Sequence, residues 1–453
     1  MIFLSEISSP TSKPILFTVY LFLFTFSFWF LSCEKNTTPL ENETPNISLE
    51  IDEVAVTEVW LNLNSENLLD KDVLRVFRDD SVIYTGIPDM AVTTLYDSGL
   101  LPAQSYSYHA SLTRNDQTIS SSNPQNITTL DTTSHDFEWE IYTIKSPYGS
   151  GMLFDAVIIN ENDIWAVGEI YSDSAQPSKC YNAVHWDGQQ WELKRIKTNA
   201  CGGVDYPSIV AIIAYTSNDI FFAHVDGSIS HFDGVDFMND CNLITQLNGS
   251  AKKIWGVSGD DLFVVSGNGF IAHYNGSSWQ KLNSGTDLNI YDIWGEVNPL
   301  TGKTEILAIA SSWPQSLDEV KLLRIENYLV YPVSVAGLPI AMTNLWFMPG
   351  KRYYLVGDGV YYTRKLGEPW VQDPDHPLIF KSGIRGHNIN DILIVGGFGL
   401  VSHFNGMSWH NYSGNELPYF NGVLGSPAYK GNIVVAVDWR GVDGIIIKGI
   451  HNQ

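Results

Sequence analysis

Two patterns of hydrophobic residues divide the chain beyond its first 45 residues. From Asn46 to Thr132 apolar and polar residues alternate in short stretches, as in Ile47, Leu49 and Ile51. Alternation of this kind predicts strands with one buried face. About 85 residues of short strands match the size of a two-sheet β-sandwich.

After Phe137 a different pattern begins, in which a continuous apolar run of about six residues recurs. Such runs are expected of strands that are covered on both faces. It follows a polar pair in most copies, as in NDIWAVG and NDILIVGG. The copies begin at Asn162, Asn218, Asp260, Thr304, Arg352, Asn390 and Gly431. Successive copies begin 38 to 56 residues apart, and a repeat of this length indicates a ring or stack of similar units.

A second motif follows the first in four copies: AVHWDGQQW (183–191), SISHFDGVDF (228–237), IAHYNGSSW (271–279) and VSHFNGMSW (401–409). Asp-Gly and Asn-Gly supply the positive φ angles of a tight hairpin. The aromatic residue after the turn is expected to pack on the neighbouring unit. Each unit therefore holds about four strands, the content of a propeller blade.

The chain ends predict how the ring closes. The seventh unit stops without the Trp-bearing final strand, whereas Phe137–Tyr142 resembles the outgoing strand that begins at Trp191. Pairing this strand with the last unit would leave no open edge. The predicted fold is all-β, a sandwich followed by a seven-bladed β-propeller, with six or eight blades as the alternatives.

The first 45 residues carry a targeting pattern. Residues 15–32 are uncharged and long enough to span a membrane, and they end in Leu31-Ser32-Cys33 before a polar stretch. This resembles the signal peptide and lipobox of bacterial lipoproteins, which implies a signal peptide over 1–32 and lipidation of Cys33. The alternative is an uncleaved N-terminal anchor. Both place the rest in a bacterial cell envelope, membrane-anchored and either periplasmic or surface-exposed.

The remaining boundaries are a flexible tether at 33–45, the sandwich at 46–132 and the propeller at 137–453. In the sandwich, the stretch Leu100-Leu101-Pro102 followed by Tyr106 resembles the L-x-P-x-x-x-Y signature of fibronectin type III domains. The resemblance implies that the Tyr106 hydroxyl bonds nearby backbone. Trp60 lies near the place of that family's core tryptophan. It is out of phase, however, with the alternating apolar residues Val59 and Leu61. We expect this domain to act as a spacer.

The net charge and the cysteine count limit the partners, disulfides and metal sites that the chain can have. The chain has 26 Lys and Arg against 50 Asp and Glu, a net charge of −24, which excludes nucleic acid as a partner. Beyond Cys33 the odd number of cysteines allows at most one bridge and a spare thiol. Cys180 and Cys201 flank one predicted hairpin and are the preferred pair over Cys241. No cysteine or histidine spacing indicates a metal site.

Candidate chemistry is sparse. His185, His231, His273 and His403 occupy equivalent repeat positions, so they belong to separate blades and predict a structural hydrogen bond within each. We identify no catalytic constellation, cofactor motif or metal. Loops longer than the repeat requires often carry binding residues. Tyr171, Tyr206 and Trp313 lie in or near such insertions and are candidate binding aromatics, with ordinary variable loops as the alternative.

Two functional hypotheses remain. The first is a lipid-anchored, non-catalytic envelope protein whose propeller is a binding or scaffold module for a protein, peptide or glycan. The second is a carbohydrate-active envelope enzyme, such as a glycoside hydrolase, lyase or glycosyl transferase, with its site over the propeller channel. Two carboxylates with Arg or His at the channel would favour the enzyme, and an aromatic surface would favour binding.

Overall fold

The computed structural model describes residues 44–452 except for 88–92, 145–150, 172–179, 199–200, 203–204, 248–249, 299–300, 313–318, 340, 378, 420 and 441–442. The chain divides into two compact units, Met1–Thr44 and Pro45–Gln453. The predicted signal peptide, Cys33 and most of the tether therefore lie outside the described residues. In the part of the chain that is described, no helix is long and apolar enough to cross a membrane.

Two antiparallel sheets form the first part of the larger unit. One has the order β1 (Asn46–Val54), β2 (Glu58–Glu66) and β5 (Thr93–Ser98). The other has the order β4 (Ser81–Gly86), β3 (Val73–Arg78), β6 (Ser105–Arg114) and β7 (Gln117–Ser121), with β8 (Gln125–Thr128) also paired to β6. Their shared core contains Leu61, Leu63, Val76 and Leu112. This arrangement is the sandwich that the alternating pattern predicted.

Two aromatic residues of the sandwich differ in outcome. The Tyr106 hydroxyl accepts a hydrogen bond from the backbone N–H of Leu101 at 3.0 Å, as the signature implies. Trp60, by contrast, is not in the sandwich core. It is buried against Ala55, Ile389 and Met348, two of which belong to the propeller. Because Val59 and Leu61 face the core, the residue between them must face outward.

Seven four-stranded antiparallel sheets follow, and the predicted count of seven blades is confirmed. Their strands in order are, for blade 1, β10 (Gly151–Asn160), β11 (Asp163–Ile170), β12 (Tyr181–Trp186) and β13 (Trp191–Lys194); for blade 2, β14 (Ile209–Thr216), β15 (Asp219–His224), β16 (Ile229–Phe232) and β17 (Phe237–Asp240); for blade 3, β18 (Ala251–Ser258), β19 (Asp261–Ser266), β20 (Ile271–Tyr274) and β21 (Trp279–Leu282).

The remaining blades repeat this order. Blade 4 has β22 (Asn289–Val297), β23 (Thr304–Ser311), β24 (Val320–Glu326) and β25 (Leu329–Val333); blade 5 has β26 (Met342–Met348), β27 (Arg352–Gly357), β28 (Gly359–Thr363) and β29 (Val371–Gln372); blade 6 has β30 (Lys381–Asn388), β31 (Asp391–Gly396), β32 (Val401–Phe404) and β33 (Trp409–Tyr412); blade 7 has β34 (Ala428–Lys430), β35 (Ile433–Val437), β36 (Gly444–His451) and β9 (Phe137–Ile144).

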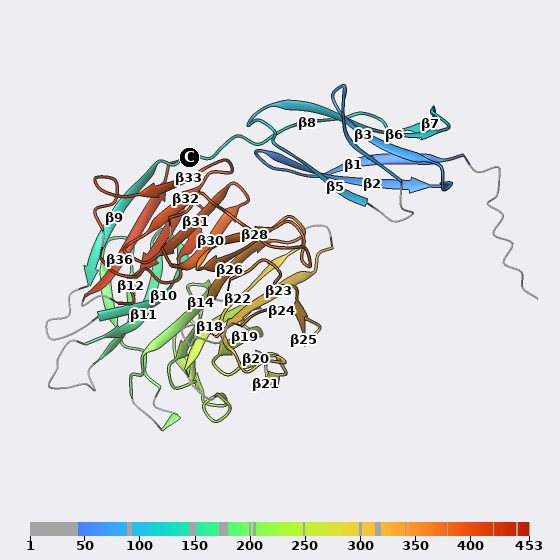
Figure 1. Cartoon of the computed structure of the whole chain (residues 1–453). Helices are drawn as coiled ribbons and strands as arrows, with labels where there is room; N and C mark the ends of the chain where they lie inside the picture. Colours follow the sequence, from blue (N-terminus) through green and yellow to red (C-terminus); the bar gives the residue numbers. More distant parts are fainter. Residues whose placement is uncertain are drawn as a thin grey trace, which may run out of the picture. The chain divides into compact units, whose positions relative to one another are not determined.

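The last blade is completed by the first strand of the propeller, as the chain ends predicted. β9 pairs antiparallel with β36, from Phe137 opposite His451 to Ile144 opposite Gly444. Figure 1 shows β9, in teal, beside β36, in red. Residues from the two ends of the ring thus share one sheet, and the fourth-strand edge of blade 7 is covered.

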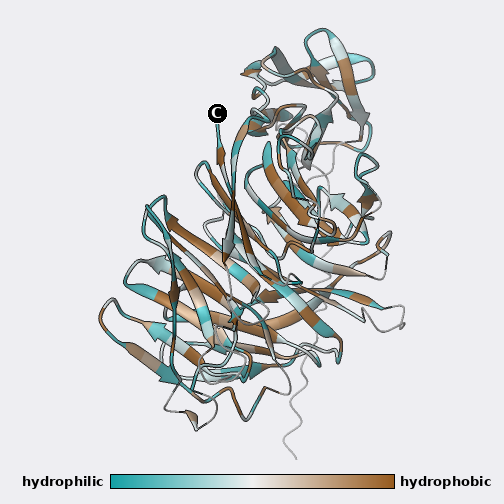
Figure 2. Cartoon of the chain, turned by 90° about the vertical axis from the view of Figure 1, so that its left-hand side faces the viewer, coloured by the Kyte–Doolittle hydropathy of each residue, from teal (hydrophilic) through white to brown (hydrophobic). Residues whose placement is uncertain are grey.

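The first strand of each blade is the innermost. β10, β14, β18, β22, β26, β30 and β34 contact one another in this cyclic order, and β34 also contacts β10. The second strands are the predicted apolar runs, and β31 and β35 are buried along their whole length. Figure 2 shows hydrophobic residues, in brown, along many of the strands, with hydrophilic residues, in teal, at many of the connections.

Alternating strand directions give the propeller two faces. Connections from the second to the third strand, and from one blade to the next, leave on the side where the innermost strands begin; we call this side the loop face. Turns from the first to the second and from the third to the fourth strand lie on the opposite side, the turn face. The predicted Trp contacts with the neighbouring unit are present: Trp279 donates to Asp240 and Trp409 to Asp373, each from one blade to the preceding one.

The sandwich contacts the turn face of blades 5 and 6. Glu58 pairs with Arg352 and Arg364, and Asp52 pairs with Lys351, all with buried or largely buried side chains. Burial alone would raise the pKa of Glu58, but the two guanidinium groups outweigh it and lower that pKa. Fixed ion pairs therefore hold the sandwich on the turn face and leave the loop face clear of these contacts.

The cysteine pairing differs from the prediction. Cys201 forms its disulfide with Cys241, with Cα atoms 5.4 Å apart, and Cys180 is a free, buried thiol. The preferred pair of Cys180 and Cys201 is therefore wrong. Both bridged residues lie on segments that join successive blades, so the bond links two adjacent connections of the loop face rather than the two ends of a hairpin.

Candidate functional site

An ion pair crosses the propeller channel between blades 1 and 3. Lys253 Nζ lies 2.8 Å from each carboxylate oxygen of Asp155 and 3.3 Å from Ser426 Oγ of blade 7. One Asp155 oxygen also accepts the backbone N–H of Ile212 at 3.1 Å. A side chain that reaches two other blades of the ring must pass through its interior, so this pair fills part of the channel.

A second pair joins blades 4 and 6. Arg385 donates to both oxygens of Asp292 at 3.1 and 3.2 Å, and to the carbonyl oxygens of Leu345 and Ile384. Its guanidinium lies 4.3 Å from the ring centre of Trp294. Two carboxylates with basic partners therefore do lie in the channel. Each is neutralised and hydrogen-bonded, which gives them a structural part rather than that of free acids or bases.

A β-bulge recurs where the innermost strand begins on the loop face. In six blades one extra residue interrupts the pairing of the first with the second strand. The bulged residues are Phe154, Val210, Lys252, Tyr291, Thr343 and Ser382. Bulges re-aim side chains and are frequent beside binding sites. The six bulges lie at equivalent positions near the channel entrance, and their residues differ from blade to blade. We call these six residues the ring of bulges.

The predicted binding aromatics have different outcomes. Tyr171 donates to the carboxylate of Glu169, which also accepts the Ser208 hydroxyl at 2.7 Å. The ring centre of Tyr206, which lies on the connection to blade 2, is 5.8 Å from the guanidinium of Arg195. The structure thus brings Tyr171 and Tyr206 to the loop face of blade 1. Trp313 lies outside the described residues.

A hydrogen-bonded corner joins blades 6 and 7 on the loop face. The segment Gly422–Gly425 lies between the second-to-third-strand connections of the two blades. Backbone bonds link Gly399 to Gly422, Leu424 to Gly396, Trp439 to Val423 and Gly425 to Val437. The buried Asp438 carboxylate binds the Tyr419 hydroxyl and the N–H groups of Val423 and Arg440. We call residues 396–400, 422–425 and 438–440 the corner; pattern reasoning did not identify it.

The four repeat histidines form the predicted hydrogen bonds within their own blades. Each histidine donates from Nε2 to an aspartate at the start of the second strand of its blade. The Nε2 to carboxylate distances are 2.9 Å in His185–Asp163, 2.8 Å in His231–Asp219, 2.7 Å in His273–Asp261 and 2.9 Å in His403–Asp391. They do not converge on one centre.

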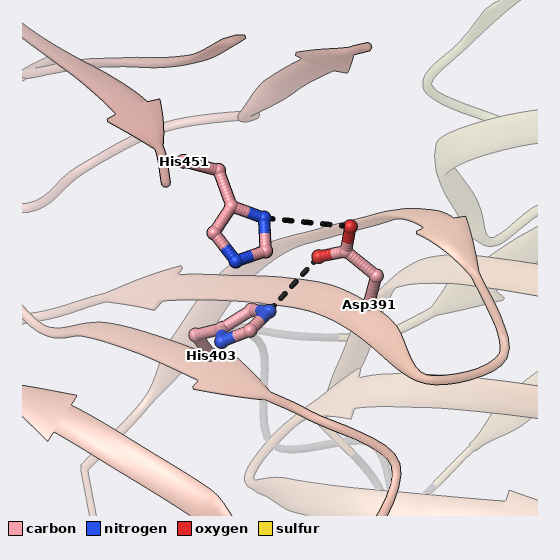
Figure 3. A group of neighbouring side chains, drawn as sticks. All are labelled: Asp391, His403 and His451. Carbon is pink, nitrogen blue, oxygen red and sulfur yellow. Dashed lines mark hydrogen bonds and ion pairs between the residues drawn. The ribbon is translucent and has the colours of Figure 1, made fainter. Parts of the chain in front are cut away.

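One of these pairs belongs to a larger buried group. Asp391, His403 and His451 place one ligand atom each within 4.8 Å of one another, a spacing that a metal ion can bridge. Figure 3 shows both imidazoles turned toward the Asp391 carboxylate. His451 comes from β36 and the other two from blade 6, so the group spans the junction beside the closing strand.

The nitrogens of both rings already have protein partners. His403 Nδ1 lies 2.9 Å from Nδ1 of His135. His451 Nε2 donates to the Ser134 carbonyl at 2.7 Å, and its Nδ1 lies 3.1 Å from the Tyr429 hydroxyl. A metal would have to replace these bonds, so the geometry fits a hydrogen-bond network that ties the segment before β9 to blades 6 and 7.

Protonation of this network is disfavoured. Burial, followed by the neighbouring histidines His403, His410 and His451, lowers the pKa of His135 to about 4. Burial also lowers the pKa of His403 and outweighs its bond to Asp391. At neutral pH both rings are therefore uncharged, as a network of shared hydrogen bonds requires.

A cavity of about 950 Å³ lies on the opposite, turn face, where the sandwich meets blades 3 to 5. Two half-exposed tyrosines, Tyr96 and Tyr328, line it together with Glu305 and Arg324. Burial raises the pKa of Glu305. Tyr328 has a φ of 63° in a tight hairpin and stacks on His273. This combination of aromatic and carboxyl groups was absent from the sequence predictions.

Comparison with known proteins finds similarity of structure alone. No protein-family model matches the chain, and no curated protein matches its sequence. The structure of YCF48 bound to D1 peptide is similar, with a TM-score of 0.52 at 15% identity over 71% of this chain and 98% of that one. YCF48 from Cyanidioschyzon merolae gives 0.50 at 14% over 69% and 98%. The WD40 β-propeller domain of Doa1 gives 0.50 at 12% over 70% and 98%. At these identities the likeness shows the propeller fold.

Proposed function

We propose that this chain is a lipid-anchored, non-catalytic protein of a bacterial cell envelope whose propeller binds an extended peptide segment of a partner protein on the loop face. The lipid anchor would be attached at Cys33. The sandwich, with its fibronectin type III-like tyrosine, would be a spacer fixed to the turn face. The membrane and the partner protein would then lie at different sides of the propeller.

The ring of bulges is the observation that carries the peptide-binding part. Six equivalent backbone positions near the channel entrance carry six different residues, of which Lys252 is exposed and Thr343 is buried. A packing role would favour similar side chains at equivalent positions, whereas recognition of an irregular ligand favours different ones. The ion pairs behind the ring fill the channel and keep it rigid, which lowers the entropic cost of binding. The similar propeller YCF48, which has been seen with a bound peptide, supports this choice of ligand.

A selection for peptide ligands tests the proposal. Full-length protein in detergent micelles is screened with a random dodecapeptide library, and the affinity of the selected peptides is measured by calorimetry. Lys252→Glu, in the ring of bulges, should change the affinity. Lys281→Glu makes the same charge change on the outermost strand of the same blade and should leave it unaltered. Failure to select any peptide would contradict the proposed function.

The cavity on the turn face favours a second candidate, a glycan ligand. Exposed aromatic rings beside carboxyl and guanidinium groups suit the apolar faces and hydroxyls of sugars. Tyr328→Gly tests this candidate, because glycine adopts the positive φ of this hairpin position without strain while the substitution removes the aromatic ring. Loss of a glycan-array signal in this variant would support the candidate, and release of reducing sugar would identify catalysis. An unchanged signal would exclude this cavity as the site.

A further inference from the structure

The connection between the second and third strands of blade 6 has a counterpart in blade 3. The sequence GGFGL at 396–400 corresponds to SGNGF at 266–270. In both turns the first residue donates its N–H to the fifth residue's carbonyl, and the fifth donates to the second, at 3.0 to 3.2 Å. Phe398 with a φ of 55° therefore occupies the place of Asn268 with a φ of 53°.

Asparagine suits this backbone position and phenylalanine does not. The left-handed conformation costs an ordinary L-residue roughly 1–2 kcal/mol, and asparagine is among the few residues that adopt it readily. Phe398 does not recover that cost by burial, because its side chain is 76% exposed. Strain that the fold does not use is a sign of function, since it persists only where something else retains the residue.

The surroundings of Phe398 form a rigid and partly cationic surface. Backbone hydrogen bonds of the corner fix the residues on both of its sides, Gly397 to Phe380 and Gly399 to Gly422. Trp439 lies across the same Gly422–Gly425 segment, and the Arg440 guanidinium stacks 4.4 Å from its ring centre. Arg440 is exposed and makes no ion pair within the described residues. Aromatic and arginine side chains on a rigid support are typical of binding hot spots.

We infer that Phe398, Trp439 and Arg440 form the recognition site of the loop face, and that its ligand is an extended peptide with an apolar side chain next to a carboxylate. This inference rests on the proposed function and specifies its contacts. The apolar side chain would pack on Phe398 and the edge of Trp439. The carboxylate would pair with Arg440, whose planar guanidinium suits a bidentate contact.

A membrane surface is the other ligand that exposed Phe, Trp and Arg side chains could bind. The charge of the chain argues against it, because a protein with a net charge of −24 is repelled by the anionic surface of a bacterial membrane. One cationic side chain cannot offset this repulsion. A short acidic peptide, in contrast, meets only the local charge at the corner.

Two substitutions and a matched control test the site in the full-length protein in detergent micelles. Phe398→Asn installs the residue of the sister turn, so the thermal midpoint should stay the same or rise while the affinity for the selected dodecapeptides falls at least about tenfold. Arg440→Glu should weaken the same peptides by a similar factor and favour peptides in which Lys replaces the acid. Asn268→Phe places a second strained, exposed phenylalanine in blade 3 and should leave peptide affinity unchanged.

Each outcome decides a different point. Selected peptides that pair an apolar residue with an acid and respond as described support the inference. Peptides that bind wild type and Phe398→Asn equally would overturn the inference but leave the proposed function standing, whereas a selection without binders would refute both. Stronger binding of wild type than of Phe398→Asn to vesicles of phosphatidylcholine and phosphatidylglycerol, with peptide affinity unchanged, would identify a membrane contact and overturn the inference.

Discussion

Removal of the Asp292 carboxylate should destabilise the propeller by about 3–5 kcal/mol, the usual cost of leaving one partner of a buried ion pair alone. Asp292 is 1% exposed and Arg385 is 3% exposed, so water cannot solvate the guanidinium that remains in Asp292→Ala. The backbone N–H of Leu345 would lose its acceptor as well. The cost should therefore lie in the upper part of that range.

Replacement of both partners separates two contributions to the loss of stability, the cost of the unpaired buried charge and the cost of the lost contacts. In Asp292→Leu with Arg385→Met neither charge of this pair remains, and apolar replacement of a buried pair is often neutral or stabilising. The unpaired Leu345 N–H would still cost about 1–3 kcal/mol. The double variant should accordingly be more stable than Asp292→Ala alone, although it carries one more substitution.

Urea denaturation followed by tryptophan fluorescence measures these differences as shifts of the transition midpoint. Glu192→Ala is the control, because Glu192 and Lys194 form a pair with side chains 42% and 38% exposed, and such pairs contribute less than about 1 kcal/mol. A loss in Asp292→Ala no greater than in this control would refute the inference that a buried pair fills the channel. So would a double variant less stable than Asp292→Ala.

Four further predictions concern other parts of the chain. Cys33→Ser should move the protein from the membrane to the soluble fraction, and its retention in the membrane would instead support an uncleaved anchor. Cys201→Ser should cost about 4 kcal/mol of unfolding free energy by the chain-entropy model for a 40-residue separation, with Cys180→Ser as a near-neutral comparison under non-reducing conditions. Burial lowers the pKa of His224 to about 4, so the unfolded chain takes up its proton first as the pH falls from about 6.5; stability should decline by up to about 1.4 kcal/mol per pH unit down to pH 4, and His224→Asn should remove that part of the slope. Deletion of Phe137–Tyr142 should lower the thermal midpoint, because blade 7 would lose its fourth strand, and an unchanged midpoint would contradict closure by that strand.

Most of the propeller could be predicted because its signals are local. The apolar second strands, the Asp-Gly and Asn-Gly turns and the Trp residues after them are set by burial and backbone conformation within a few residues. Ring closure required one further inference, that Phe137–Tyr142 resembles the strand missing from the seventh blade. The pairing of β9 with β36 confirms it.

The residues that sequence reasoning missed depend on the spacing of blades around the ring. Asp155 and Lys253 are 98 positions apart and meet only because the channel brings blades 1 and 3 together. His451 of blade 7 likewise meets Asp391 of blade 6 only because the two blades pack side by side. Cys201 forms its disulfide with Cys241 rather than Cys180 because the connections between successive blades lie together on the loop face.

Phe398 is a different case, because its signal was present in the sequence. Alignment of GGFGL with SGNGF shows a phenylalanine where the sister turn has Asn-Gly. That the turn requires a positive φ became apparent only with the backbone angles of both. A repeat position whose residue opposes its local conformation is a marker that repeat alignments of such propellers can use.

Photo-crosslinking of a bound peptide tests the central claim most directly. A selected dodecapeptide that carries benzoylphenylalanine at its apolar position is irradiated with the full-length protein, and the attachment sites are mapped by mass spectrometry. We predict attachment to the loop face, within 396–400, 422–425 or 438–440 or at the ring of bulges. Attachment to the turn face, at 187–190, 233–236 or 275–278, or to the sandwich, would contradict the account.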